Sequence, residues 1–221
     1  DASSDKLHPV KKFRPIASGK LPVFIALLEL FLFIFLSLII AISLNQLFFT
    51  IILTYLGLQA LYSLGLKNLH VVDILIIATG FILRVYAGAF IINAHLSVWF
   101  LLCVVSASLF LAAGKRRAEI NLLEATDGGT RKSLSKYSKE LLNSYVTMFG
   151  NATWMSWALY TFFESPRATL GFWMVLAELS RATTIDKLMM LTIPVVIFGI
   201  MRYEALIFEG KSEAPEKLLL T

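Results

Sequence analysis

Long apolar runs recur along this chain, and they constrain its fold more than any other feature. Each run is close to the roughly 20 residues that a helix needs to cross the hydrocarbon core of a bilayer. Of the 221 residues, 57% are hydrophobic and only 16% are charged, which is far from the composition of a soluble globular domain. A transmembrane β-barrel would instead show alternating segments of about ten residues. The sequence therefore predicts an all-α, polytopic transmembrane helix bundle.

Six of these runs are predicted to span the membrane. The predicted spans are residues 22–43, 47–64, 71–92, 98–113, 141–163 and 188–208. Residues 114–139 are hydrophilic and contain a turn at Asp127-Gly128-Gly129-Thr130. Residues 166–187 place apolar side chains at helical spacing among charged ones, which predicts an amphipathic helix in the membrane interface.

The distribution of positive charge predicts how the spans are oriented. Residues 1–20, Lys67, the segment 114–139 and the tail after Phe208 fall on one side of the membrane and carry most lysines and arginines, so this side is predicted to be cytoplasmic. The net charge of +5 thus indicates topology and anionic partners rather than nucleic acid. The two hydrophilic segments, 1–20 and 114–139, are expected to face the same compartment and to close over one site.

Acids, bases and a histidine are concentrated in the first twenty residues. Asp1 and Asp5 are four positions apart, so on a helix their carboxylates would lie on one face, with about 5–6 Å between Cβ atoms. Mg²⁺ binds through one or two carboxylates together with substrate phosphate oxygens, and Lys11, Lys12 and Arg14 would match the remaining phosphate charge. A solvated positive loop without a ligand is the alternative. The order of acids followed by bases favours a metal–diphosphate site.

Arg84 lies near the middle of the third predicted span. An arginine facing lipid at that depth is unfavourable by a few kcal/mol, so its side chain should face the bundle interior, a water-filled cavity or an acid. Asp73 precedes it by eleven positions (84 − 73), or three helical turns, and so lies on nearly the same face. Two interpretations of Arg84 stay open. It could pair with an acid such as Glu29 for packing alone, or it could form the deep cationic wall of an anion-binding cavity.

The remaining candidates lie at the predicted inner membrane surface. Lys115 and Glu119 have the spacing of an ordinary surface ion pair, worth a few tenths of a kcal/mol. Together with the first segment, however, Lys115 and Arg116 suit phosphate, and Glu119 suits a second acid near the metal. Arg202 and Tyr203 have the default role of snorkelling anchors, and Tyr137 that of an interfacial anchor. No role is assigned to His70 or His95.

Several motifs resemble one family of membrane enzymes. The stretch Asp1-Ala-Ser-Ser-Asp5 resembles the second half of the NDxxDxxxD motif of the UbiA superfamily of membrane prenyltransferases. The run from Asp5 to Gly19 is similar to the decaprenyl-phosphate phosphoribosyltransferase branch of that superfamily. Further similar motifs are Tyr62-Ser63, Leu66-Lys67, Val72-Asp73, Gly80–Arg84, Gly114–Glu119, Leu191–Pro194 and Arg202-Tyr203.

The resemblance implies that residues 1–221 are one transmembrane domain from the middle of a nine-helix bundle. Two spans and the Asn-Asp opening of the motif are expected before Asp1, and a last span is expected after Thr221. Aromatic prenyltransferases of the superfamily carry a DxxxD motif in the second loop. This chain has Lys115-Arg-Arg-Ala-Glu119 there, with Glu124 and Asp127 in a different pattern. One acid cluster with extra cations suits phosphoribosyl diphosphate better than a prenyl diphosphate.

The activity implied by the resemblance is Mg²⁺-dependent transfer of 5-phosphoribose from phosphoribosyl diphosphate to a polyprenyl phosphate. It would take place at the cytoplasmic face of the inner membrane and serve the synthesis of cell-envelope polysaccharide precursors. Asp1 and Asp5 are the expected metal ligands, and Asp1, Asp5, Lys12 and Arg14 are the expected catalytic residues. The expected substrate-binding residues are His8, Lys11, Lys67, Asp73, Arg84, Lys115, Arg116, Glu119, Arg202 and Tyr203.

Two other functions stay open at this point. The first is transfer of a prenyl chain from a prenyl diphosphate to an aromatic or other acceptor. The second is non-catalytic anion transport, which predicts polar residues on both sides of the membrane midplane, whereas here they cluster on one side.

Overall fold

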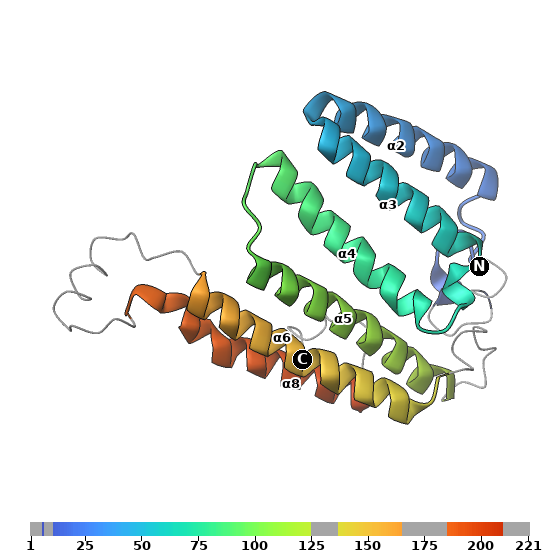
Figure 1. Ribbon diagram of the computed structural model, residues 1–221. Helices are drawn as coiled ribbons and strands as arrows, with labels where there is room; N and C mark the ends of the chain where they lie inside the picture. Colours follow the sequence, from blue (N-terminus) through green and yellow to red (C-terminus); the bar gives the residue numbers. More distant parts are fainter. Residues whose placement is uncertain (1–5, 7–10, 125–136, 165–184, 210–221) are drawn as a thin grey trace. The chain divides into compact units, whose positions relative to one another are not determined.

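The computed structural model describes residue 6 and residues 11–124, 137–164 and 185–209, with the backbone alone at 11, 122–124 and 185–188. The regular elements within these ranges are all helical (Figure 1). The 3-10 helices are η1 (Lys11–Phe13), η2 (Leu66–Asn68) and η4 (Ile185–Thr192). The α-helices are α2 (Val23–Leu44), α3 (Gln46–Leu64), α4 (Val72–Ile91), α5 (Val98–Glu124), α6 (Lys139–Phe163) and α8 (Ile193–Phe208).

The chain divides into two compact units. The first comprises residues 1–94 and 119–139, and the second comprises residues 95–118 and 140–221. Helices α2, α3 and α4 therefore belong to the first unit, and α6 and α8 belong to the second. Helix α5 belongs to the second unit up to Ala118 and to the first unit from Glu119 onward.

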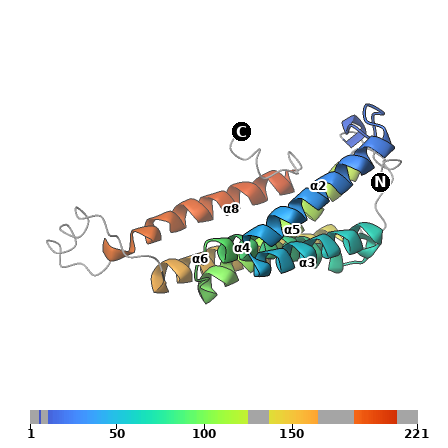
Figure 2. The same ribbon diagram turned by 90° about the horizontal axis from the view of Figure 1, so that it is seen from above.

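Within the first unit, α3 contacts both α2 and α4 and lies between them in Figure 1; Figure 2 gives the same helices seen from above. A single residue, Asn45, separates α2 from α3. Its backbone is extended (φ −162°), and its side-chain Oδ1 accepts a hydrogen bond of 2.7 Å from the Leu47 N–H. This bond satisfies one of the N–H groups that the start of a helix leaves without an intrahelical partner. Asn45 therefore ends one helix and caps the next.

Five helices in the described part of the chain are long and apolar enough to cross a membrane, which confirms the predicted polytopic bundle. They cover Val23–Leu44, Gln46–Leu64, Val72–Ile91, Val98–Asn121 and Met189–Phe208. Several hydroxyl groups inside these spans donate to the backbone of their own helix. Thr50, Thr54 and Thr79 each donate to a carbonyl oxygen four residues earlier in their own helix, at 2.8–3.0 Å.

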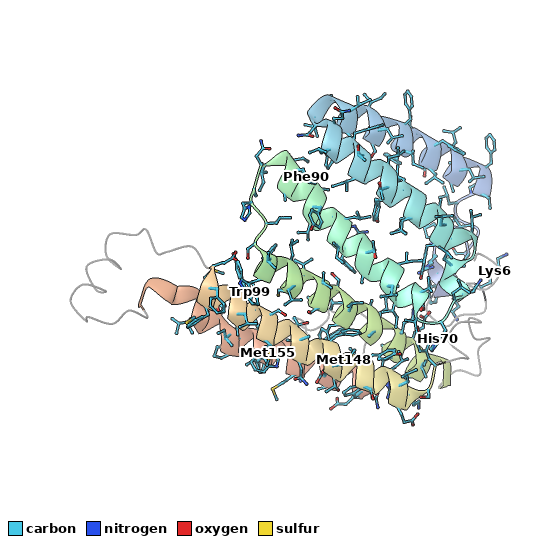
Figure 3. The ribbon with its side chains drawn as sticks, in the orientation of Figure 1. Lys6, His70, Phe90, Trp99, Met148 and Met155 are labelled. Carbon is cyan, nitrogen blue, oxygen red and sulfur yellow. The ribbon has the colours of Figure 1, made fainter. Side chains whose placement is uncertain are left out.

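The predicted span 141–163 forms helix α6, but its hydropathy is lower than that of the five spans above. Polar residues on α6 cause this difference, and several of them are buried: Thr153, Ser156 and Thr161 are 7%, 4% and 0% exposed. Their hydroxyls donate to carbonyls of α6 itself. Part of the polar surface of α6 is therefore buried against other parts of the protein. Met148 and Met155 of the same helix, labelled in Figure 3, are more than half exposed.

One predicted boundary was wrong and another was close. The fourth span was expected to end at residue 113, but α5 continues to Glu124, because lysine, arginine, alanine and glutamate are good helix formers even where the chain becomes hydrophilic. The last span was expected to begin at residue 188, and the observed apolar span Met189–Phe208 agrees with this; its first residues lie in η4, and α8 begins at Ile193 with Pro194 in its first turn. The predicted turn at 127–130 and most of the predicted interfacial helix 166–187 lie outside the described residues.

Two glycines allow close packing of helices in the second unit. A Cβ added to Gly114 on α5 would lie 2.7 Å from Ile207 Cδ1 and 3.0 Å from Tyr203 Cε1, both on α8. A Cβ added to Gly150 on α6 would lie 2.9 Å from Glu204 Oε1 of α8 and 3.2 Å from Phe110 Cε2 of α5. Small residues at such positions let membrane helices approach each other closely.

Replacing Gly114 with alanine is expected to destabilise the folded protein. Ile207 is 0% exposed and Tyr203 is 4% exposed, so neither side chain can move aside freely, and overpacking of this kind costs about 1–3 kcal/mol. That cost exceeds the roughly 1 kcal/mol that alanine gains over glycine in a helix. Thermal unfolding in detergent should show a lower Tm for Gly114→Ala.

The matched control is Gly88→Ala on α4, where an added Cβ would meet no atom within 4 Å. Gly88→Ala should leave the Tm unchanged or raise it. An unchanged or higher Tm for Gly114→Ala would contradict the packing described for α5 and α8.

Candidate functional site

The hydrophilic residues before α2 supply exposed cations. Lys12 and Arg14 are both exposed, and the Lys12 Nζ lies 5.2 Å from the centre of the Phe13 ring. Lys11 lies in η1. The other predicted residues of this segment, Asp1, Asp5 and His8, lie outside the described residues, so their arrangement stays a prediction.

The predicted magnesium site depends on Asp1 and Asp5. Among the side chains that the structure does describe, no three His, Cys, Asp or Glu residues are grouped closely enough to hold a metal ion. Chemically, the two aspartates fit Mg²⁺, because carboxylate oxygens are the protein ligands that this hard cation takes, with substrate phosphates completing its coordination.

A buried polar cluster joins the turn before α4 to a residue from the second hydrophilic segment. The Tyr137 hydroxyl donates a hydrogen bond of 2.8 Å to Asp73 Oδ1 and accepts one of 2.8 Å from the Val71 N–H. Asp73 is 0% exposed and Tyr137 is 7% exposed. The His70 ring packs against the Tyr137 ring, with 4.1 Å between centroids and a 41° tilt, and Figure 3 shows His70 at the N-terminal end of α4. We call His70, Val71, Asp73 and Tyr137 the Tyr137 cluster.

Two features set the Tyr137 cluster apart from ordinary packing. Val71 has a φ of +67°, a left-handed conformation that is unfavourable for a β-branched residue and costs of order 1–3 kcal/mol. In addition, the Nε2 atom of His70 is buried and has no hydrogen-bond partner among the described residues. Backbone strain and unsatisfied buried polar atoms are concentrated at functional sites more than elsewhere.

Sequence reasoning missed this cluster. It assigned no role to His70 and treated Tyr137 as an interfacial anchor, a prediction that was wrong because Tyr137 is buried and bonded to Asp73. Tyr137 follows Asp73 by 64 positions, so no local spacing links them. The one available signal was topological: residues 114–139 and the turn at Lys67 were expected on the same side of the membrane. Lys67 lies in η2, directly before the cluster, and is half-buried.

Arg84 contacts α3 rather than an acid. Its Nη2 donates to the Tyr55 hydroxyl, and its guanidinium carbon lies 5.1 Å from the Tyr55 ring centre and 5.4 Å from that of Phe81. A Cβ added to Gly80 would lie 3.6 Å from the Tyr55 ring, an ordinary van der Waals contact, so the approach of α3 and α4 there does not depend on glycine. Arg84 is exposed whereas Asp73 is fully buried, and the two are roughly 16 Å apart along the helix axis. Arg84 and Asp73 were predicted to lie on nearly the same face of the helix, but their surroundings in the structure are different.

Successive residues at the end of α5 differ sharply in exposure. Lys115 is exposed, but Arg116 is 1% exposed and Glu119 is 6% exposed. Arg117 is also buried; its Nε donates to Asn143 Oδ1 at 2.6 Å, and its guanidinium lies 5.8 Å from the Phe208 ring. Of the three basic residues in a row, Lys115 alone is open to solvent in the described structure.

The two candidates on α8 differ in environment. Arg202 is half-buried. Tyr203 was expected to be an interfacial anchor, but it is 4% exposed and packs against Gly114 and edge-on against Phe110, with 5.3 Å between ring centroids. The anchor interpretation is therefore wrong for Tyr203. Lys115, Arg116, Arg202 and Tyr203 belong to the second unit, whereas Lys67, Asp73, Arg84 and Glu119 belong to the first.

Comparison with known proteins gives one consistent family. Residues 1–179 match the UbiA prenyltransferase family. The chain is 36% identical over 230 residues to a decaprenyl-phosphate phosphoribosyltransferase of Corynebacterium glutamicum, covering 100% of this chain and 63% of that protein. It is 38% identical over 162 residues to the protein of the same name in Mycolicibacterium smegmatis, covering 73% of this chain and 51% of that protein. The chain thus spans between half and two thirds of the length of these relatives.

A solved structure supports the same fold. The structure of a UbiA homologue from Archaeoglobus fulgidus bound to GPP and Mg²⁺ matches 95% of this chain and 80% of its own, with a TM-score of 0.65 and 17% sequence identity. This comparison concerns the fold alone, and it agrees with the membrane-spanning helices described above. The chain therefore belongs to the UbiA prenyltransferase family and is an integral membrane protein.

Proposed function

We propose that this protein transfers 5-phosphoribose from phosphoribosyl diphosphate to a polyprenyl phosphate. The observation that carries the proposal is the similarity of the whole chain, at 36% identity, to a relative named for decaprenyl-phosphate phosphoribosyl transfer. The residues agree with it: the segment where aromatic prenyltransferases carry a second aspartate motif holds Lys115, Arg116 and Arg117 instead. Extra cations match a donor that carries a 5-phosphate besides its diphosphate.

Exposed basic residues would bind the donor. Lys12, Arg14 and Lys115 are exposed to solvent, and each can donate charge-assisted hydrogen bonds to phosphate oxygens. Lys67 would bind a further phosphate oxygen from the turn before α4, and Lys11 and His8 would complete the donor site. Asp1 and Asp5 would hold Mg²⁺, which supplies neutralisation of the diphosphate charge when bound.

The reaction needs little acid–base chemistry from the protein. An oxygen of the polyprenyl phosphate, already anionic, attacks C1 of the ribose. The bond between C1 and the diphosphate oxygen breaks, and diphosphate leaves with its electron pair. Lys12, Arg14 and Lys115 stabilise the charge that develops on the leaving group. Arg84, held by Tyr55 within the span, would bind an anionic phosphate of either substrate, and the prenyl tail would lie among the membrane-spanning helices.

The proposed site faces the cytoplasm from the inner membrane, and its product would serve cell-envelope polysaccharide synthesis. The positive-inside distribution of lysine and arginine supports this orientation. The Tyr137–Asp73 hydrogen bond agrees with the expectation that the end of the second hydrophilic segment and the N-terminal end of α4 lie on the same side of the membrane.

A labelled-donor assay in membranes that contain the protein tests the proposal. Incubation with ribose-labelled phosphoribosyl diphosphate, polyprenyl phosphate and Mg²⁺ should give a labelled lipid that is extracted into organic solvent, and omission of either substrate should abolish it. A parallel incubation uses labelled prenyl diphosphate with aromatic acceptors. Labelled product from the prenyl donor alone would contradict the proposal and favour prenyl transfer. Uptake of phosphoribosyl diphosphate into vesicles without any product would favour transport.

A further inference from the structure

We propose that Tyr137 is a positioning residue for the donor site, and that it acts by holding the turn between η2 and α4, and with it Lys67, in one conformation. The inference rests on the proposed function, since Lys67 is given the role of a phosphate ligand there. It assigns Asp73 a different task from the one predicted from the sequence. Asp73 serves as the hydrogen-bond acceptor that fixes Tyr137, not as a ligand of the substrate.

The Tyr137 hydroxyl group makes two hydrogen bonds at once. Tyr137 donates to the side chain of Asp73 and accepts from the backbone of Val71, each at 2.8 Å. A phenol has one donor hydrogen and accepts through its oxygen lone pairs, so this hydroxyl is engaged in both senses. Asp73 and Tyr137 are almost completely buried, so water cannot easily replace either bond.

The backbone that Tyr137 holds is in an unfavourable conformation. Val71 precedes α4 as its cap residue, and its left-handed φ of +67° is a conformation that a valine rarely adopts. Such a conformation persists only where the surrounding structure enforces it. The Val71 N–H is the group bound by Tyr137. A return of Val71 to an ordinary negative φ would change the direction in which η2 leaves α4, and Lys67 would move with η2.

The Tyr137 ring is itself held in a fixed position. The His70 ring packs on it at 4.1 Å, and the buried His70 Nε2 makes no hydrogen bond among the described residues. The histidine thus acts through the face of its ring rather than through that nitrogen. Tyr137 is held on one side by His70 and at its hydroxyl by Asp73, so the cluster forms a rigid support four residues after Lys67.

Tyr137→Phe removes the hydroxyl and keeps the ring, and Tyr145→Phe is its matched control. Tyr145 is a half-buried tyrosine on α6 whose ring packs against Phe149 and whose hydroxyl makes no hydrogen bond among the described residues. In membranes containing the protein, Tyr137→Phe should raise the KM for phosphoribosyl diphosphate about tenfold with little change in kcat, and the Tm should fall because Asp73 and the Val71 N–H each lose a buried hydrogen-bond partner. Tyr145→Phe should behave as wild type. A lower Tm with an unchanged KM would show a purely structural role and overturn the proposal.

Two substitutions of Asp73 distinguish a residue that positions Tyr137 from a residue that binds substrate directly. Asp73→Asn keeps the shape and the carbonyl oxygen that accepts from Tyr137 but removes the charge, whereas Asp73→Leu removes the acceptor. If Asp73 positions Tyr137, the asparagine variant retains a near-normal KM and the leucine variant matches Tyr137→Phe. Equal loss of activity in both variants would mean that the charge of Asp73 contacts substrate, and it would overturn the proposal.

A double variant tests whether Tyr137 acts through Lys67. Lys67→Ala alone should raise the donor KM, and adding Tyr137→Phe to it should then have little further effect, because the group that Tyr137 positions is already absent. Independent, additive effects of the two substitutions would contradict the inference.

Hydrogen exchange distinguishes failure of this inference from failure of the proposed function. Without substrate, Tyr137→Phe should increase amide exchange in the peptide that contains Val71, since the acceptor of that N–H is lost, while Tyr145→Phe should not. Unchanged exchange would overturn the role of Tyr137 whatever the reaction is. If exchange rises but no labelled lipid forms with wild-type protein, the proposed function fails and the assigned role of Lys67 fails with it.

Discussion

Replacing Asp5 with asparagine is expected to abolish phosphoribosyl transfer while the protein stays folded in the membrane. Asparagine has nearly the same shape but lacks the negative charge with which a carboxylate binds Mg²⁺. The rate should fall by about 10²–10³-fold or more, the scale on which a single preorganised electrostatic group contributes to catalysis. The labelled-lipid assay measures this loss, and expression level and Tm show that folding is intact.

The control for charge is Glu29→Gln. Glu29 is an exposed acid of α2, and its neutralisation should leave the rate unchanged. A titration with Mg²⁺ adds a second readout: any residual activity of Asp5→Asn should require a higher Mg²⁺ concentration than the wild type. Near-normal turnover of Asp5→Asn at the same Mg²⁺ concentration would exclude a metal-binding role for this residue.

Alanine substitutions at Lys115 and Arg116 are expected to have opposite consequences, although the two residues are neighbours. Lys115 is exposed, so Lys115→Ala should raise the KM for phosphoribosyl diphosphate about tenfold and leave the Tm unchanged. Arg116 is among the largest fully buried side chains. Emptying a buried site of that size costs about 2–5 kcal/mol, so Arg116→Ala should lower the Tm and the yield of folded protein.

Arg116→Met tests the packing contribution separately, because methionine restores part of the volume without the charge. Its Tm should lie between those of the wild type and Arg116→Ala. Arg116 would instead be a phosphate ligand, as the sequence first indicated, if Arg116→Ala kept the wild-type Tm and raised the donor KM as Lys115→Ala does.

The membrane-spanning helices were the most predictable part of this protein. Predicted spans 22–43, 47–64 and 71–92 agree closely with α2, α3 and α4, because a run of apolar residues ended by polar ones is a direct signal of bilayer thickness. The end of α5 was missed because hydropathy marks where a helix leaves the membrane, not where it stops. Helix α6 was recovered as a helix, but its buried hydroxyls show that a hydropathy pattern does not reveal which face meets protein.

The candidate site was predictable in its residue types and much less in its contacts. The sequence pointed to Arg84 as a residue that needs a partner, yet it suggested Glu29, whereas the structure shows Tyr55. Asp73 was singled out, but its bond to Tyr137 could not be inferred from positions 64 residues apart. Exposure separates Lys115 from Arg116, and that difference depends on which side of α5 is covered. Tertiary contacts of this kind produce no regular residue spacing that could be recognised in the sequence.

The corner at Asn45 limits how this protein can vary. Because one residue ends α2 and caps α3, no spare length exists there to absorb an insertion. One added residue would turn every side chain of the following helix by about 100° about its own axis, since an α-helix has 3.6 residues per turn. The Tyr55 hydroxyl would then point away from Arg84, so a change of length at this corner would remove the acceptor that holds the guanidinium of a membrane-spanning helix.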